Sequence, residues 1–500
     1  MGVSLNPSTI LSGQGIDVST IVQQIISEQS GQLTVWEGEQ TTFATQDGLL
    51  EGMENNLVSL QTAVAALANP VGALAAQAAT SSDTGVLTAA AQSTAIAGTH
   101  QIVVSSLATT GTLYTNPIAA GAGTSFLSSG QTTGDVQLQV GGNSGTTYDI
   151  PIAQGSNDTL TTLSEYINTQ STANNWGVTA SVVSDATGSR LALQSQHSGS
   201  TGALAIVNNS NTTLTFAIPE GGANAALTID GVPFSSSTNT VTGAIQGVTL
   251  NLAGLSSGTP PSEVVQLTVG PDQNQIMTAA NNFISAYNTV VSTINSQYVV
   301  DPTGSIPAPP LEADPSLRSL QFSMLTDAGY ALPGATDTVT PNSGIVNLAS
   351  MGINMNNDGT LTMGSTPSAS DANSQTFAQV LAANPAAVVN FFQNASGTGF
   401  ANSFNTDLTN LTDAKQGPLN VDLAQNQAED SDLTTTIANF QAQLTTETTA
   451  LTQQYDAVNA SLQEYPLLLQ AATEELGTLG SGTSSSGSLV SSEPTLTSGL

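Results

Sequence analysis

The chain has 500 residues, of which 39% are hydrophobic and only 8% charged, and three basic residues face 36 acidic ones, giving a net charge of -33. This acidic balance excludes nucleic acid held through its phosphates and disfavours an anionic membrane surface, because almost no cation is present to neutralise either partner. Without cysteine, and with only His100 and His197 as histidines, we expect no disulfide, no metal site, no cofactor and no catalytic residue.

The first residues, 1–16, are expected to be disordered, and they lack the basic and apolar regions of a cleaved secretion signal. No apolar run approaches the ~18–20 residues of a transmembrane helix, so we expect no membrane insertion. The chain is therefore either cytoplasmic or exported by a route that cleaves nothing.

A long N-terminal helix is predicted from Asp17, a suitable N-cap, to the residues before Pro70, within a segment that we bound at 17–80. Apolar residues recur there every seven positions and form a seam. Four glycines in this helix each weaken it by up to ~1 kcal/mol, so it needs a partner. The seam residues are Val22, Ile25, Trp36, Phe43, Leu50, Met53, Leu57, Leu60, Val64 and Leu67.

Strands are predicted from Ser81 onwards, where the hydrophobic period changes to two. We expect one β-rich domain from residues 81–130 and 216–270, with a turn at Asp230 and Gly231. Residues 131–215 are expected to form a second, autonomous β-rich domain inserted into the first, with a short helix near 160–167. The stretch 121–130 has the composition of a Gly/Ser linker.

The next region, 271–420, is expected to be mainly helical. Pro271 opens its first helix, and shorter helices are predicted around 315–325, 377–383, 385–392 and 400–411. Residues 356–359 (Asn-Asn-Asp-Gly) resemble the start of a calcium loop, but no acidic ligand occupies the twelfth position. A type I′ hairpin turn is the better interpretation.

A second seam predicts a C-terminal helix, assigned to 421–476, that starts near Val421 and is kinked or ended at Pro466. Residues 477–500 are expected to be a disordered tail. The seam residues are Leu433, Ile437, Phe440, Leu444, Leu451, Val458, Leu462 and Tyr465.

Matching seams at both ends predict that the terminal helices pair antiparallel, as a coiled coil or helical bundle. The predicted fold class is multidomain α+β, with a helical leg and two β-rich inserted head domains. Trp36, Phe43 and Tyr465 could instead stack on a ligand, but their seven-residue register favours the seam. Trp176 lies outside any seam, and its role stays open. Such a plan is typical of axial proteins of extracellular filaments rather than of enzymes.

The acidic balance, with a sequence pI near 4.1, fits a protein that works in an acidic exterior. A secreted protein that is merely poor in lysine fits it equally well.

Several segments resemble, in order and spacing, the family of bacterial flagellar filament-capping proteins, also called hook-associated protein 2. The start of the resemblance is Gly-Ile-Asp-Val-Ser-Thr-Ile-Val at 15–22. Further segments are 82–89, 97–104, 227–233, 315–320, 348–353, 358–361 and 384–388. Two departures from the family are helices rich in Gln, Thr and Ala rather than in charged residues, and Pro466 within the C-terminal helix.

The resemblance implies a leg built from the terminal helices (D0 and D1) and a head of two β-rich domains (D2 and D3). It implies a secreted protein at the distal tip of the flagellum, with no enzyme activity, which promotes polymerisation of exported flagellin and so serves motility. The implied partners are further copies in a ring, commonly a pentamer, together with flagellin, hook–filament junction proteins and a type III export chaperone. A host or surface glycan is a further possible partner. The alternatives are another axial protein (a flagellin or a junction protein) and a surface adhesin that uses the head domains.

Overall fold

The computed structural model describes residues 16–303, 305, 307–335, 345–364, 375–394 and 396–480. The expected disordered ends, 1–16 and 477–500, lie almost entirely outside the described residues. The chain divides into two compact units, each discontinuous in sequence. Unit 1 holds the residues up to Val58, Ser292–Ser323 and those from Thr409; unit 2 holds Ser59–Val291 and Met324–Leu408.

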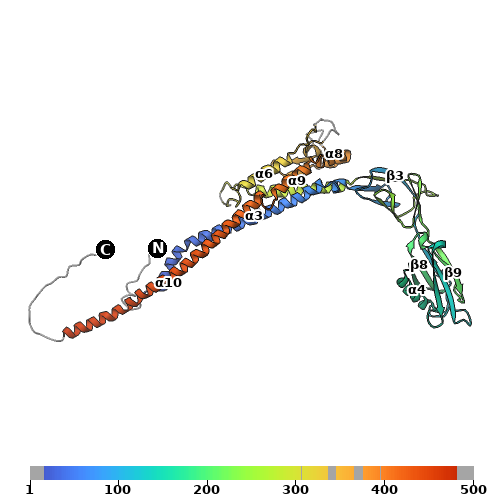
Figure 1. Ribbon diagram of the computed structural model, residues 1–500, viewed down its shortest axis with the longest axis horizontal. Coiled ribbons are helices and arrows are strands. Elements are labelled where there is room, and N and C mark those ends of the chain that lie inside the picture. The colour runs from blue at the N-terminus through green and yellow to red at the C-terminus, as the bar shows by residue number, and fades with distance from the viewer. Residues whose placement is uncertain are drawn as a thin grey trace, which may run out of the picture. The chain divides into compact units, whose positions relative to one another are not determined.

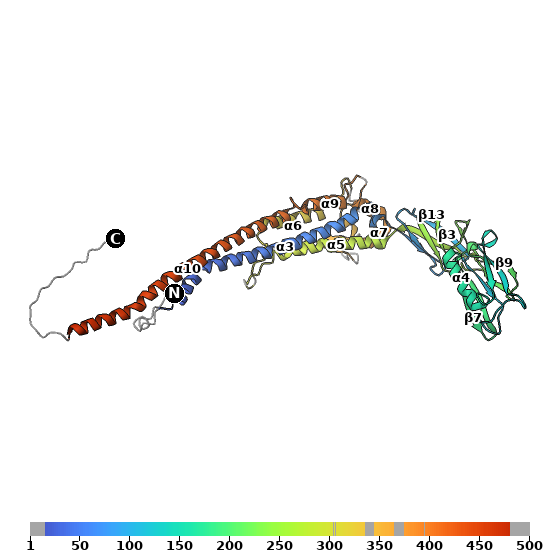
Figure 2. The same ribbon diagram turned by 60° about the horizontal axis from the view of Figure 1, so that its bottom comes forward.

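Unit 1 is helical. Its elements are α2 (Val18–Gln29), the first part of α3 (Gly31–Ala68), the end of α5 (Gln273–Ser296), the start of α6 (Pro315–Ala328), and α10 (Pro418–Gly480). Asp17 caps α2 as predicted, since its carboxylate accepts a hydrogen bond from the backbone N–H of Thr20 at 3.1 Å. Figures 1 and 2 both show α3 and α10 side by side.

One expectation about these long helices is wrong. The N-terminal helix is not continuous, because it is divided at Ser30, immediately before Gly31, where the low helix propensity of glycine makes a break inexpensive. Of the two alternatives left open for Pro466, a kink or an end, the structure excludes the end, because α10 continues through Pro466 to Gly480. A proline removes one backbone hydrogen bond, and in so exposed a segment water satisfies the carbonyl that is left without a partner.

One stretch, Gly31–Ala75, is long and apolar enough to cross a membrane by length and composition alone, contrary to the expectation from the sequence. Leu57, Leu60 and Val64 within it are fully buried in the protein. A helix that packs in a protein core can pass the same test, so length and composition alone are weak evidence that this stretch spans a membrane.

The first β domain of unit 2 consists of two antiparallel sheets. The larger has the order β1-β15-β3-β11-β12 and the smaller the order β13-β14-β2. The strands are β1 (Gln77–Ser81), β2 (Leu87–Ala91), β3 (Gly98–Ser106), β11 (Ala225–Ile229), β12 (Val232–Ser236), β13 (Thr240–Ile245), β14 (Val248–Leu252) and β15 (Val265–Pro271). Alternate residues of both sheets, such as Ile102, Leu250 and Leu267, fill a shared core, as the period of two predicts.

The second β domain also has two antiparallel sheets, with the orders β10-β4-β8-β7 and β6-β5-β9. The helix α4 (Leu160–Asn174) packs on β7, as Figure 2 shows, and Thr159 caps it in a capping box. The strands are β4 (Thr110–Thr115), β5 (Thr133–Val140), β6 (Thr146–Ala153), β7 (Val178–Asp185), β8 (Gly188–Ser198), β9 (Leu204–Ser210) and β10 (Phe216–Gly221).

The core of this second domain is wider than the expected range 131–215. Leu113 and Phe126, on the N-terminal side of that range, are each only 1% exposed, and Phe216 also packs against the same core. The backbone N–H of Phe126 donates to the carbonyl of Asp158 at 2.9 Å, so the supposed linker 121–130 is part of the domain. The Gly and Ser content of 121–130 suggested a linker, but Phe126 within this segment is buried in the core of the domain.

The rest of unit 2 is mainly helical. It contains the second part of α3, most of α5, the end of α6, and α7 (Phe377–Ala383), α8 (Pro385–Phe392) and most of α9 (Phe400–Leu411). Short 3-10 helices are Ala73–Ala75, Gly142–Ser144, Ser200–Gly202 and Ala349–Met351. Its core is formed by aromatic rings whose neighbouring centroids lie 5.4 to 6.5 Å apart: Phe283, Tyr287, Tyr330, Phe391, Phe392, Phe400 and Phe404. Burial raises the pKa of the Tyr287 hydroxyl, which donates to the carbonyl of Met324 at 3.2 Å.

The predicted hairpin near Asp358 is present between β16 (Ile353–Met355) and β17 (Leu361–Met363), but its turn is not type I′. A type I′ turn needs two consecutive residues with positive φ, whereas in this hairpin only Gly359 (φ 82°) has one. The carboxylate of Asp358 accepts hydrogen bonds from the backbone N–H and the hydroxyl of Thr360, and these bonds stabilise the longer loop.

Candidate assembly interface on the terminal helices

Within unit 1, the two ends of the chain lie antiparallel. The backbone N–H of Ile16 donates to the side chain of Asn459 at 2.8 Å. Further along, Gln29 donates to Glu447 at 2.8 Å and Gln40 donates to the hydroxyl of Thr434 at 2.7 Å. Residue numbers rise along the N-terminal helices as they fall along α10, as expected for an antiparallel pair. One register therefore describes the contact from residue 16 to about residue 40.

The apolar side of this contact carries a ring pair. Trp36 of α3 and Phe440 of α10 meet edge to face, with centroids 5.3 Å apart. Ile437 and Leu444, one turn to either side of Phe440, are buried, whereas Leu433, Phe440 and Leu451 are half-buried.

The first seam changes partners along its length. Val22 is buried and Ile25, Trp36 and Phe43 are half-buried, whereas Leu50, Met53, Leu57, Leu60, Val64 and Leu67 are at most 1% exposed. The register above would place residues beyond Leu57 past the start of α10 at Pro418, so another element must cover them. Asn56 donates to Thr293 of α5 at 3.3 Å, and the Gln393 amide donates to the carbonyls of Leu67 and Asn69.

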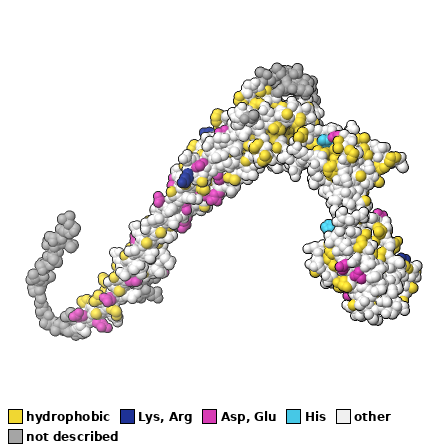
Figure 3. All heavy atoms as spheres, turned by 45° about the vertical axis from the view of Figure 1, so that its right-hand side comes forward, with side chains coloured by type: hydrophobic (Ala, Val, Ile, Leu, Met, Phe, Trp, Pro, Cys, Tyr) yellow, Lys and Arg dark blue, Asp and Glu magenta, His cyan; other side chains and the backbone are white. Residues whose placement is uncertain are grey.

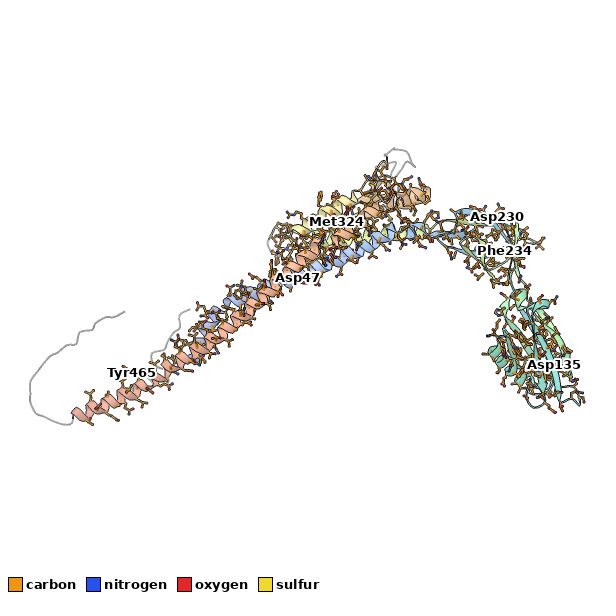
Figure 4. All side chains as sticks on the ribbon, in the orientation of Figure 1. Asp47, Asp135, Asp230, Phe234, Met324 and Tyr465 are labelled. Atoms are coloured by element: carbon orange, nitrogen blue, oxygen red, sulfur yellow. The ribbon has the colours of Figure 1, made fainter. Side chains whose placement is uncertain are left out.

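The second seam, on α10, extends beyond the residues that contact the N-terminal helices. Asn459 contacts Ile16, which is the first described residue of the chain, so this register offers no described residue opposite the part of α10 after Asn459. Val458 and Tyr465 are 45% and 63% exposed. Leu462 is half-buried, and Leu467, Leu468 and Leu469 are each more than half exposed. Figure 4 labels Tyr465 on this part of α10. The terminal third of α10 therefore presents apolar side chains to its surroundings.

Amide and hydroxyl groups, rather than salt bridges, flank the helix contact. The two ion pairs among the described residues, His100–Asp230 and Arg190–Asp185, both lie in the β domains. The apolar seam alone does not predict the bonds from Gln29 and Gln40. The abundance of Gln and Thr beside the seam was the signal that could have revealed them.

Three carboxylates in unit 1 are poorly solvated. Asp47, Glu54 and Asp422 each have a buried oxygen that makes no hydrogen bond in the described part of the chain. Burial raises the pKa of Glu54, and a hydrogen bond from Asn420 partly opposes it. Burial also raises the pKa of Asp422, with a hydrogen bond from Ser316 opposing it and the charge of Asp314 adding to it.

Two other kinds of site were considered from the sequence: a ligand site at Trp176 and a metal site. Trp176, whose role the sequence left open, is 7% exposed and stacks on Tyr148 with ring centroids 4.8 Å apart, so it is a core residue. Within the described ranges, no three His, Asp or Glu side chains are grouped so as to hold a metal ion.

Two models of one protein family match this chain. The model of the flagellar hook-associated protein 2 N-terminus matches residues 14–111, and that of its C-terminus matches residues 222–465. Together they cover more than half of the chain. The unmatched residues between them coincide with the second β domain.

Known proteins agree with these matches. The B-type flagellar hook-associated protein 2 of Pseudomonas aeruginosa is 27% identical over 410 residues, which are 77% of this chain and 80% of that protein. The A-type protein of the same species is 32% identical over 143 residues, 28% of this chain and 27% of that protein. The D1-D2-D3 domains of the flagellar cap protein FliD from Escherichia coli share the fold, with a TM-score of 0.52 and 22% identity over 76% of this chain and 99% of that one.

These matches favour neither a flagellin nor a hook–filament junction protein, and the matched family is one of structural proteins rather than enzymes. With both family models matched in order on either side of an inserted β domain, the chain belongs to the flagellar hook-associated protein 2 family, the caps at the distal tip of the bacterial flagellar filament.

Proposed function

We propose that this cap holds the filament through its terminal helices and that further copies of the chain join it in a ring, as in the family's commonly five-fold rings. In this proposal 17–80 and 421–476 are the leg, D0 and D1, with the helical residues 271–420 completing D1. Residues 81–109 and 222–270 are D2, and residues 110–221 are D3. The ring promotes polymerisation of exported flagellin beneath it.

The observation that carries this proposal is the uncovered apolar surface at the end of α10. Val458, Tyr465 and Leu469 are between 45% and 63% exposed, on a helix whose earlier seam residues are covered by α2 and α3. An apolar row of this length in water is unfavourable and marks a contact site. Helices of flagellin or of a hook–filament junction protein supply the complementary surface in the assembled flagellum.

The same surface needs protection before export. A type III export chaperone that covers the end of α10 would keep the chain from aggregating inside the cell. Adhesion to a glycan stays a prediction: Trp176, the aromatic side chain that the sequence left open, is covered by Tyr148.

The test replaces exposed residues, so that folding is preserved. Tyr465→Asp and Leu469→Asp are each introduced into the full chain, with Val421→Asp as the matched control, because Val421 is 46% exposed on the same helix. In a strain that lacks its own cap, we expect the control to restore filament growth. The two test variants should leave unpolymerised flagellin in the medium and swimming lost. Normal filaments with both variants would disprove the role of this surface.

A further inference from the structure

A cavity of about 540 Å³ opens at one end of the first β domain. Three segments line it: residues 96–100, which lead into β3; residues 229–234, which form the β11–β12 turn and β12; and residues 244–246, at the end of β13. Its volume lies within the ~300–1,000 Å³ of typical binding pockets.

The walls of the cavity are apolar. Ile229 and Ile245 form the buried part, and Phe234 is half-buried. Ile96 and Val232 at the mouth are 67% and 65% exposed. Figure 4 labels Phe234 and Asp230 in this domain, and Figure 3 shows hydrophobic side chains gathered on the surface of the β-rich part of the molecule. Exposed apolar residues around a hollow mark a contact site.

A fixed negative charge stands at the rim. The carboxylate of Asp230 accepts hydrogen bonds from the backbone N–H of Gln101 and from Nδ1 of His100, both at 2.8 Å. These bonds, the one from Gln101 first, lower the pKa of Asp230 and keep the carboxylate ionised. Asp230 and Gly231 both have positive φ, 51° and 81°, so a type I′ turn holds this charge in place. No Lys or Arg is among the residues that line the cavity.

The complementary chemistry is an apolar side chain next to a cation, and the chain itself carries one such pair. On α6, Arg318 is exposed and Phe322, four residues later on the same helix face, is 72% exposed. Of the other two basic residues, Arg190 lies over the Tyr114 ring within its own domain. The large apolar residues four positions from Lys415 do not offer an exposed side chain for the cavity, since Leu411 is half-buried and Leu419 is 1% exposed.

We propose that the cavity receives Phe322 of a neighbouring copy of the chain, with Arg318 of that copy placed against Asp230. Two different surfaces meet in such a contact, which is the head-to-tail type that closes into rings. The inference rests on the proposed ring, and it names one interface within it. Phe322 supplies most of the affinity, because burying an aromatic side chain outweighs a half-exposed ion pair.

Sedimentation of the purified full chain over a range of concentrations tests this contact. Phe322→Ser should weaken ring association about tenfold or more per contact, whereas Val183→Ser, at a 55% exposed valine of the second β domain, should leave it unchanged. Arg318→Gln should weaken it about three- to fivefold, and Lys415→Gln, which changes the net charge equally, should not.

A double-mutant cycle with Asp230→Asn checks the pairing, since asparagine tolerates positive φ and keeps the acceptor for Gln101. The variant with both Arg318→Gln and Asp230→Asn should associate no more weakly than either single variant. Additive losses would overturn the pairing. Melting curves of every variant separate these effects from misfolding.

A photo-crosslinking residue at position 322 locates the contact directly. In a mixture of ¹⁵N-labelled and unlabelled copies, crosslinks between heavy and light peptides that contain residues 229–234 are expected. Crosslinks only within one chain, or none to this segment, would overturn the inference. A wild-type chain that forms no ring at any concentration would instead count against the proposed function itself.

Discussion

Trp36 and Phe440, which are separated by the whole middle of the chain, meet at an interplanar angle of 84° with their ring centroids 5.3 Å apart. This pair fixes the lateral position of α3 against α10 where no ion pair does so. Edge-to-face pairs contribute about 0.5–1.5 kcal/mol beyond the area they bury.

A double-mutant cycle of Trp36→Ala and Phe440→Ala should therefore show a coupling of about 1 kcal/mol in the free energy of unfolding of the helical leg. Chemical unfolding followed by circular dichroism measures it. Val35→Ala, at a 54% exposed neighbour, serves as the control and should change the stability by less than about 0.5 kcal/mol. Strictly additive effects of the two substitutions would mean that the rings do not stabilise each other.

Leu57→Asp should weaken assembly more than Leu138→Asp. Both leucines are fully buried, the first in the leg helix α3 and the second in the second β domain. A buried, unpaired carboxylate costs about 3 to 5 kcal/mol in either place. We expect ring mass in sedimentation to fall for Leu57→Asp and to persist for Leu138→Asp, whose damage should stay in its own domain. An equal loss of rings from both variants would show that the head drives assembly.

Deleting residues 110–221 should leave a folded remainder. The backbone N–H of Thr109 donates to the carbonyl of Ala223 at 2.9 Å, so the two cut ends are already neighbours. The narrower deletion of 131–215 leaves Leu113 and Phe126 without their core. The first deletion should melt cooperatively in calorimetry, and the second should aggregate. A narrower deletion that melts as cooperatively as the wider one would place the boundaries of the second β domain at 131 and 215 instead.

The helical leg should gain stability as the pH falls from neutral towards pH 4. Glu54 and Asp422 have raised pKa values in the folded chain, so they take up protons on folding. The stability they contribute is present below their unfolded pKa and is lost as the pH rises through the folded pKa. Carboxylates with lowered pKa values, such as Asp17 and Asp413, act in the opposite direction at still lower pH.

Glu54→Gln and Asp422→Asn should accordingly raise the melting temperature at pH 8 and flatten its dependence on pH. Each effect is small, about 0.5 kcal/mol, because neither side chain is fully buried. Glu165→Gln, an exposed glutamate of α4, is the control. A leg whose melting temperature climbs steadily from pH 4 to pH 8 would contradict this prediction.

Periodicity predicted most elements of this fold. The seams from Val22 to Leu67 and from Leu433 to Leu451 coincide with buried or half-buried side chains, because a seven-residue repeat places them on one helix face. Periodicity could not predict the change of partner after Leu57, since burial against α5 and burial against α10 select the same residues. The position at which α3 changes its partner from α10 to α5 is set by the start of α10 at Pro418.

Local composition misled in two places. Phe126 is one aromatic residue in a stretch of Gly and Ser, and its burial depends on hydrogen bonds to Asp158 and Thr213, which are distant in sequence. The pair of His100 and Asp230 is separated by the entire second β domain, so no spacing rule could join them. The sequence predicted the turn at Asp230 and Gly231, but it gave no sign that His100 contacts Asp230.

The amide-flanked contact between the terminal helices has a consequence for salinity. Salt screens charges over ~8 Å at physiological ionic strength, and it would loosen a leg held by ion pairs. The contact is made instead by side-chain hydrogen bonds from Gln29 and Gln40 and by the rings of Trp36 and Phe440, and salt weakens such contacts little. Salt does reduce the mutual repulsion among the chain's 36 acidic residues. We therefore expect the helical leg to stay paired at low ionic strength and to become slightly more stable as the ionic strength rises.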